Sequence, residues 1–272
     1  MQKFSASPIQ IFNGFLTHRS LIWAMTKREV IGRYRGSMMG ILWSFFNPVL
    51  MLTVYTFVFS VVFKARWNAA SESKTEFAIV LFAGMIVFNL FAECLNRAPS
   101  LIVANVNYVK KVMFPLEILP WVVLGSTFFH TLVSLLAWVI FYLVIHQSLQ
   151  WTVLFFPLVL LPLMMCAMGI SWFLAALGVY LRDVAQTMGI ITTILMFLSP
   201  VFFSIASLPA AYRPFMYANP LTFIIEQARN VLIWGVMPDW LMLGAYTLGS
   251  AMVFWLGFAW FQKTRKGFAD VL

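Results

Sequence analysis

The sequence predicts an all-α membrane protein with six transmembrane helices, an N-terminal amphipathic interface helix, and re-entrant outer helices between the fifth and sixth spans. Composition is the first reason, because 62% of residues are hydrophobic, 10% are charged, and the mean hydropathy is +0.89. Residues 36–63 contain no charged residue and no histidine, and at ~1.5 Å per residue they exceed the ~30 Å hydrocarbon layer of a bilayer. Because Lys and Arg flank such runs, the net charge of +9 indicates membrane orientation rather than nucleic-acid binding.

The first two predicted elements join a basic segment to a long apolar one. In residues 20–35, helical spacing puts Trp23 and Tyr34 on one face and Arg28 on another, which predicts a helix lying in the headgroup layer. The first span follows at residues 37–63. Because Lys and Arg beside a span resist translocation, we place its first end in the cytoplasm. The opening twenty residues lack a continuous apolar core, so we expect no removable signal peptide.

Five further spans are predicted from apolar runs that polar turns separate. They cover residues 77–96, 118–145, 151–180, 185–205 and 240–261. With this topology both termini and most of the 18 Lys and Arg residues lie on the cytoplasmic side of one membrane domain, residues 1–272. Cys94 and Cys166 are too few for a disulfide framework, so we expect both to be small buried hydrophobes.

The segment between the last two spans, residues 207–238, departs from this pattern. Four prolines break it into pieces that are too short to cross a membrane, which is tolerated only where protein or a water-filled cavity covers the backbone. We expect an outer gate over a pore, with Glu226 and Arg229 as an ion pair satisfied locally at the outer interface. The candidate gate residues are Tyr212, Tyr217, Glu226 and Arg229. The alternative is two interfacial helices that only pack on the bundle.

The residues predict little catalytic chemistry. No Gly-Lys dipeptide occurs, which excludes a P-loop for ATP, and neither HExxH nor GxSxG is present. We therefore expect no enzyme activity, no metal and no cofactor in this chain. A coupled carrier would need ionisable residues in mid-membrane, whereas acids such as Glu93 are expected at span ends. The energy source is then expected outside the chain.

Four blocks of sequence carry a resemblance to a known family. In chain order they are RYRGSMMGILWSFFNPVLMLTVYTFVFSVVFKARW, YVKKVMFPLEILP, GVYLRDVAQ and NPLTFIIEQARNVL. Together they resemble the membrane subunit of ABC exporters for polysaccharides, specifically the O-antigen type. The resemblance implies a homodimer in the bacterial inner membrane and two separate ATPase subunits that bind ATP and Mg. It implies a glycan on undecaprenyl diphosphate as cargo, and permeases for capsular polysaccharide or teichoic acid are similar alternatives.

The resemblance also implies contacts with the ATPase subunits. It makes residues 97–109 a coupling helix, with Ala104, Asn105 and Asn107 as contact residues, whereas the alternative is an ordinary connecting loop. Arg182 and Asp183, in the turn before the fifth span, are a second candidate contact. The alternative for Asp183 is a helix cap, because Asp suits the position before a helix.

The glycan and its carrier lipid would need two kinds of lining. Aromatic rings can pack on sugar faces, and the first and fifth spans line the channel in the resembled family, although lipid packing explains many aromatics equally well. The channel candidates are Trp43, Phe46, Tyr55, Phe197, Phe202 and Phe203. The diphosphate needs cations at the inner headgroup level, where Arg offers forked donors, although membrane orientation alone also explains these arginines. The diphosphate candidates are Arg28, Arg33, Tyr34 and Arg35.

Two classes of function remain open on this basis. One is the exporter permease, and the other is a non-transporting membrane scaffold for glycan synthesis. A glycosyl-polymerising membrane enzyme is disfavoured because acidic residues are scarce. Co-purification of an ATPase subunit would separate the first class from the others.

Overall fold

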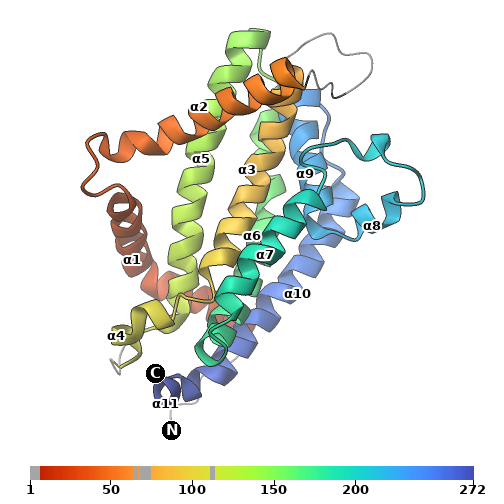
Figure 1. Cartoon of the computed structure of the whole chain (residues 1–272). Coiled ribbons are helices and arrows are strands. Elements are labelled where there is room, and N and C mark those ends of the chain that lie inside the picture. Colours follow the sequence, from red (N-terminus) through yellow and green to blue (C-terminus); the bar gives the residue numbers. More distant parts are fainter. Residues whose placement is uncertain (1–6, 64–66, 68–74, 111–113) are drawn as a thin grey trace.

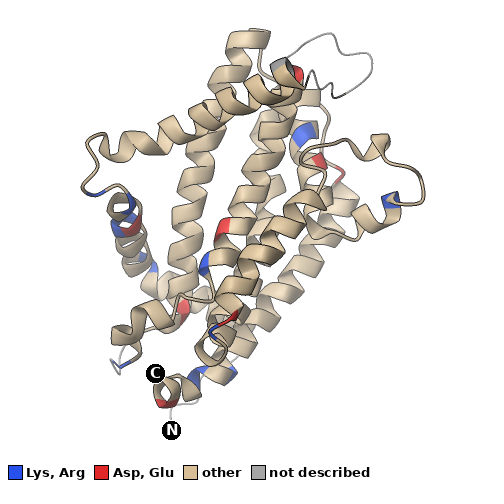
Figure 2. Ribbon diagram, in the orientation of Figure 1, with Lys and Arg blue, Asp and Glu red and all other residues tan. Residues whose placement is uncertain are grey.

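The structure, a computed structural model, describes residues 7–63, 67, 75–110 and 114–272, which fold into a helical bundle. Most long helices run between the two ends of the molecule, whereas α1 (Pro8–Arg33) and α2 (Trp43–Tyr55) lie to one side (Figure 1). The short helices α4 (Val106–Val109) and α11 (Phe268–Val271) sit at one end of the bundle. We call this the basic end, because many of the described Lys and Arg residues lie toward it (Figure 2).

Helix α1 occupies the place of the predicted interface helix but is longer. It begins at Pro8 instead of residue 20 and ends at Arg33 instead of residue 35. Proline suits the first turn, because the N–H that it lacks would have no partner there. The buried side chains of α1, among them Ile22 and Val30, face α5 (Leu119–His146), while Trp23 is exposed. One face of α1 thus packs on the bundle.

The first span is an irregular helix that leans across α5. Pro48 lies inside α2, and beyond Tyr55 the chain continues as a π-helix, Thr56–Val62. Proline removes a backbone donor and π-turns widen the helix, so both interrupt regular α-helical bonding. The stretch Gly40–Phe59 is long and apolar enough to cross a membrane, yet little of it is buried by the rest of the chain. The apolar surface of this span is therefore left open in the single chain.

Helix α3 (Glu76–Arg97) is the centre of the bundle. Nearly all its side chains between Phe77 and Leu95 are buried, and it packs against α5 and α6 (Phe156–Tyr180). A helix that is apolar over most of its circumference belongs in such a position. The indole N–H of Trp138 donates to the backbone carbonyl of Ile79 at 3.0 Å and so fixes α5 against α3. A buried indole donor needs an acceptor of this kind.

Helices α6 and α10 (Trp240–Thr264) form the closest contact between two long helices. A Cβ atom added to Gly257 would lie 1.9 Å from the carbonyl oxygen of Gly169, and one added to Gly169 would lie 2.4 Å from the carbonyl oxygen of Val253. Small residues let the backbones of membrane helices approach this closely. These two glycines therefore set the distance between α6 and α10.

The fifth predicted span, 185–205, is shorter in the structure. Helix α7 (Val184–Phe197) has 14 residues, or roughly 21 Å, which is less than the ~30 Å hydrocarbon layer. Within the described residues, five helices are long and apolar enough to cross, and α7 is a shorter apolar helix. Proline disfavours helical geometry in the preceding residue, and Pro200 follows shortly after the end of α7. The expectation of a full-length fifth span is corrected accordingly.

The segment between α7 and α10 contains two α-helices, a 3-10 turn (Ile205–Ser207) and a π-helical turn. Helix α8 (Arg213–Tyr217) is short, and α9 (Pro220–Arg229) continues into the π-helix Asn230–Trp234. Asn219 caps α9, because its side-chain oxygen accepts from the N–H of Leu221 at 3.0 Å. Most side chains of α9 are buried, and it packs against α3 and α6. Only part of the segment is therefore peripheral.

Arg229 lies in the protein interior and not at an interface as the sequence analysis expected. Its side chain is 1% exposed, whereas that of its partner Glu226 is 39% exposed. It donates to the backbone carbonyls of Val80 at 3.2 Å, Pro200 at 2.6 Å and Val201 at 2.9 Å. After α7 ends, the backbone carbonyls of Pro200 and Val201 need donors, and Arg229 supplies them. The predicted pair with Glu226 exists, at 3.1 Å, but it is one part of a buried junction between α3, α7 and α9.

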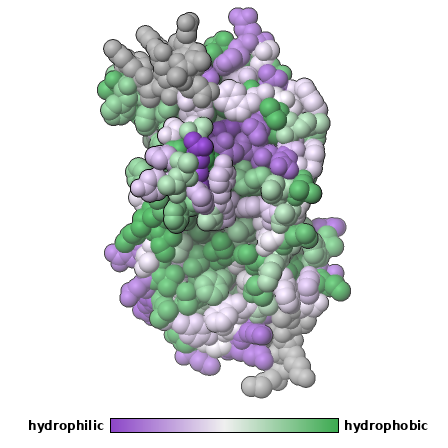
Figure 3. Space-filling view, turned by 90° about the vertical axis from the view of Figure 1, so that its right-hand side faces the viewer, coloured by the Kyte–Doolittle hydropathy of each residue, from purple (hydrophilic) through white to green (hydrophobic). Residues whose placement is uncertain are grey.

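A hollow of about 830 Å³ lies between this segment and α10, and its lining includes Tyr217, Glu226, Asp239 and Tyr246. Hydrophilic side chains gather in the upper half of the same side of the molecule, above a band of hydrophobic ones (Figure 3). Tyr212 and Tyr217, two of the predicted gate residues, are exposed. The segment thus presents polar and aromatic groups on its outer surface.

Candidate functional site

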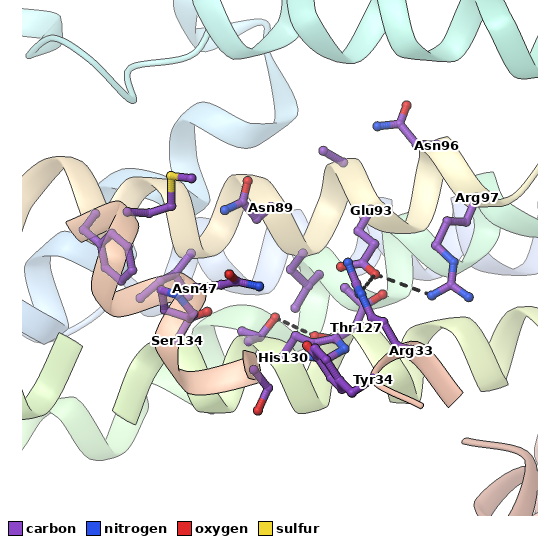
Figure 4. A pocket seen from close by; sticks show the side chains of 18 of the residues that line it. Arg33, Tyr34, Asn47, Asn89, Glu93, Asn96, Arg97, Thr127, His130 and Ser134 are labelled. Atoms are coloured by element: carbon purple, nitrogen blue, oxygen red, sulfur yellow. Dashed lines mark hydrogen bonds and ion pairs between the residues drawn. The ribbon is translucent and has the colours of Figure 1, made fainter. Parts of the chain in front are cut away.

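A polar cavity of about 550 Å³ lies between α2, α3, α5 and the end of α1. One wall is a face of α3 that carries Asn89, Glu93 and Arg97, and Figure 4 shows Glu93 and Arg97 pointing toward the end of α1. The facing wall belongs to α5 and includes Thr127, His130, Thr131 and Ser134. Helical spacing aligns these residues, because positions three and four apart share one face. Two apolar spans thus turn polar faces toward a common space.

Charged side chains link the ends of α1 and α3 at this cavity. Oε1 of Glu93 accepts from Nη1 of Arg33 at 2.7 Å and lies 3.5 Å from Nη1 of Arg97. Arg97 also pairs with Glu29 on α1 through its other terminal nitrogen. These four side chains are partly screened from solvent, so their attraction is stronger than that of a fully exposed pair. The network holds α1 against the last turn of the central helix.

Tyr34 and His130 meet beside this network. The Tyr34 hydroxyl lies 3.4 Å from Nδ1 of His130, and the two rings meet edge to face at 5.8 Å (Figure 4). Burial raises the pKa of Tyr34 above its ordinary value, so its hydroxyl remains protonated and can donate. Nε2 of His130 is buried and has no hydrogen-bond partner among the described residues. A buried polar atom without a partner is uncommon, so the wall of the cavity at His130 contains an unsatisfied group.

The four predicted diphosphate residues separate into two groups. Arg33 and Tyr34 line the cavity. Arg28 instead donates to the hydroxyl of Tyr108 on α4 at 3.1 Å and so joins α1 to α4. Arg35 lies beyond the end of α1, is exposed, and is not part of the cavity lining. The structure thus brings two of the four residues to one site.

Three of the predicted channel aromatics form part of a continuous run of rings. Phe59, which the sequence analysis did not select, lies with its ring centroid 6.5 Å from that of Tyr55 and 6.2 Å from that of Phe202. Phe202 in turn stacks on Phe197 at 5.8 Å. The run connects the first span to the end of α7. Phe203 is half-buried next to it.

Trp43 and Phe46, the other two channel candidates, lie apart from this run. Both are exposed side chains at the beginning of α2. Ser44 and Asn47, on the same helix, line the polar cavity instead. The beginning of α2 thus turns polar groups inward and two large aromatics outward.

The predicted coupling helix is two short turns in the structure. Helix α3 ends at Arg97, and a 3-10 turn (Val103–Asn105) precedes α4, so 97–109 is not one continuous helix. Pro99 is close to α6, because a Cβ atom on Gly178 would lie 2.0 Å from the Pro99 carbonyl oxygen. The three predicted contact residues, Ala104, Asn105 and Asn107, lie in these turns, and the Asn105 amide donates to the carbonyl of Leu101 at 2.8 Å.

The second predicted contact, Arg182 and Asp183, is an exposed turn at the basic end between α6 and α7. The Asp183 side chain makes no capping hydrogen bond to α7. Its backbone carbonyl accepts from the Thr187 hydroxyl at 2.9 Å instead. Asp183 thus holds the N-cap position, but the alternative of a side-chain cap is not observed, and the side chain is exposed.

The polar face of α3 was not predicted from the sequence. Glu93 lies near the end of α3, as expected, but its ion pairs with Arg33 and Arg97 were not anticipated. The signal was present as helical spacing, since Asn89, Glu93, Asn96 and Arg97 recur at intervals of three and four. Asn96 faces α7, where its side-chain oxygen accepts from the hydroxyl of Thr192 at 3.0 Å.

Residues 20–233 match the family model described as ABC-2 type transporter. A relative named O-antigen export system permease protein RfbA, from Myxococcus xanthus, is 26% identical over 264 residues, which cover 96% of this chain and 99% of the relative. A relative of the same name from Klebsiella pneumoniae is 24% identical, with 93% and 95% covered. The polysialic acid transport protein KpsM of Escherichia coli is 22% identical, with 93% and 96% covered. Because the family model covers more than half of the sequence, the chain belongs to the ABC-2 type transporter family.

Proposed function

We propose that this chain is the permease subunit of an ATP-driven exporter that moves undecaprenyl-diphosphate-linked O-antigen polysaccharide across the bacterial inner membrane. The observation that carries the proposal is the cavity at which α1, α2, α3 and α5 meet, with Arg33 and Tyr34 at its edge. Guanidinium groups offer paired donors to phosphate oxygens, and the amide and hydroxyl groups of the lining suit a hydrated ligand. The names of the full-length relatives support this cargo class.

The proposed assembly is a homodimer with two ATPase subunits, which would bind ATP and Mg. The basic end would face the cytoplasm with both termini, because Lys and Arg accumulate on that side of a membrane. Helix α4 and the Arg182 turn lie at this end, where they can contact an ATPase. The apolar surface of the first span is left uncovered in the single chain, which supports a contact with a second copy of the chain there. In this assembly the permease itself catalyses no reaction.

Replacing Arg33 with Gln should lower export by roughly tenfold, because one charge-assisted contact to phosphate is worth about 1.4 kcal/mol or more. Arg35→Gln should have a smaller effect, since Arg35 lies outside the cavity lining. The measurement is the amount of surface polysaccharide in cells that depend on each variant. Equal membrane levels of the variants must be shown by immunoblot. Normal export by the Arg33→Gln, Arg35→Gln double variant would reject the ligand role.

The outer segment around α8 is proposed as a gate that limits ion leak through a glycan-sized pore. Its exposed tyrosines, Tyr212 and Tyr217, lie away from the buried junction at Arg229. Shortening the loop that carries α8, while leaving α9 intact, should therefore raise the ion conductance of sealed vesicles without unfolding the dimer. A conductance no higher than that of the intact protein would argue for helices that merely pack on the bundle.

A capsular polysaccharide exporter is the second candidate, because relatives named polysialic acid transport protein also align over nearly the whole chain. The two cargoes differ in where the polymer ends up in the cell. Chemical analysis of the polymer that accumulates inside cells lacking this chain separates them. A scaffold without transport activity would leave ATP hydrolysis by a co-purified ATPase independent of this chain.

A further inference from the structure

We infer that Glu93 is a resident counter-anion of the cavity. Its carboxylate holds the guanidinium pair of Arg33 and Arg97 in the place that a diphosphate group takes, and a binding diphosphate displaces it. The inference rests on the proposed function and deepens it by naming the group with which the phosphates compete.

The geometry around Glu93 is that of an occupied anion site. A single oxygen, Oε1, faces Nη1 of Arg33 at 2.7 Å and Nη1 of Arg97 at 3.5 Å, from two different helices. Guanidinium groups converging on one oxygen is also how arginines hold phosphate. Arg97 is held in place independently, because its other terminal nitrogen pairs with Glu29. Arg97 therefore stays in position when Glu93 turns away.

The pair is accessible from the cavity. The side chain of Arg33 is 51% exposed and that of Glu93 is 23% exposed, so neither is locked in the core. Among the described residues that line the cavity, Glu93 is the one carboxylate. Apart from Glu93 and the two arginines, the described lining side chains carry no formal charge in their usual state, and they include the amides of Asn47 and Asn89. Glu93 is thus the one carboxylate of this lining that an entering anion meets, because Glu29, the other partner of Arg97, is not part of the lining.

The charge balance explains why a carboxylate is needed there when no ligand is present. Glu29 and Glu93 balance Arg33 and Arg97. Without Glu93, the two arginines would face one carboxylate, and an uncompensated charge near the membrane interior is costly. A bound diphosphate can supply the missing negative charge itself. Glu93 therefore stabilises the empty cavity and weakens ligand binding by competition.

The test is Glu93→Gln, which removes the charge and keeps the shape of the side chain. The permease in complex with its ATPase, in lipid nanodiscs, is titrated with undecaprenyl diphosphate in a calorimeter. We expect the variant to bind about tenfold more tightly than the wild type. Adding Arg33→Gln to it should remove that gain. Unchanged or weaker binding by a Glu93→Gln complex that melts like the wild type would overturn the inference, because a purely structural ion pair predicts this result.

A matched control and a fallback variant keep the test decisive. Glu117→Gln makes the same chemical change in an ion pair with Arg265 that lies outside the cavity, and it should leave affinity unchanged. An equal gain in this control would show a general charge effect and overturn the inference. If the Glu93→Gln complex does not assemble, Glu93→Asp keeps the charge with a shorter reach and should give a smaller gain. A loss of affinity in Glu93→Asp would count against the inference.

Inorganic pyrophosphate, titrated in parallel, separates a lipid headgroup from a free anion. We expect it to compete with undecaprenyl diphosphate and to bind Glu93→Gln more tightly as well. A gain for pyrophosphate without one for the lipid would overturn the assignment to a lipid. Export measured with the same variants shows whether this inference alone fails or the proposed function fails as well. A wild type that binds and exports, with no gain in Glu93→Gln, rejects this inference alone, whereas a wild type that does neither rejects the proposed function.

Discussion

Replacing Arg229 with Met should unfold the outer half of the bundle or prevent the protein from assembling. The change removes the side-chain donor to the carbonyls of Val80, Pro200 and Val201 and the cation that lies 4.3 Å from the ring centroid of Trp67. Removing one partner from a buried charged network costs roughly 3–5 kcal/mol, a large share of the ~5–15 kcal/mol that stabilises a typical protein. The measurement is the melting temperature in detergent, followed by size-exclusion chromatography of heated samples.

Arg213→Met is the matched control for this prediction. Arg213 lies in the same outer segment and also donates to backbone carbonyls, those of Ala206 and Leu208, each at 3.0 Å. It is only partly buried, so solvent can replace it and the loss should be about 1 kcal/mol. If both variants melted at the temperature of the wild type, the buried junction at Arg229 would not be needed for stability.

Gly257→Ala should separate α6 from α10 and strongly destabilise the bundle. The new Cβ atom would lie 1.9 Å from the carbonyl oxygen of Gly169, which belongs to the backbone and cannot rotate away. The helices would have to move apart along their whole contact, at a cost of about 3 kcal/mol for overpacking. Melting temperature and the yield of monodisperse protein both report this effect.

Gly249 provides the control on the same helix. A Cβ atom added there meets no atom within 4 Å. Gly249→Ala should therefore leave stability unchanged or raise it by up to ~1 kcal/mol, because Ala favours the helix more than Gly does. Similar melting temperatures for the two alanine variants would contradict the role assigned to the contact at Gly169.

Hydropathy predicted the long helices well because the apolar character of a run of residues can be read from that run alone. The runs that contain α3, α5, α6 and α10 are predominantly apolar, and their ends fall where charged residues, proline or a short polar turn interrupt them. The end of α7 could not be predicted in this way. The chain remains apolar through Val201, but the helix stops at Phe197, and the carbonyls it frees depend on Arg229, far away in the sequence.

The candidate site was predicted only in part, for a related reason. Arg33 was selected because cations beside a span suggest headgroup contacts, and this argument needs no knowledge of the fold. Glu93 and Arg97 looked like span-end charges, and only the packing of α1 against α3 turns them into partners of Arg33. The spacing of Asn89, Glu93 and Arg97 was a usable signal, because polar residues repeating at helical intervals inside an apolar run face something other than lipid.

The short length of α7 has a consequence for how the protein is made. A helix of 14 residues that covers roughly 21 Å cannot enter a bilayer as an independent span. Helix α9 also cannot stay in hydrocarbon alone, since Arg229 needs acceptors from α3 and from the residues after α7. These two helices must therefore settle after the earlier spans have inserted, with α3 already present as a template. Biogenesis of this chain therefore includes a folding step inside the membrane. A ribosome stalled before residue 229 would leave α3 and the residues after α7 without the hydrogen bonds that Arg229 donates.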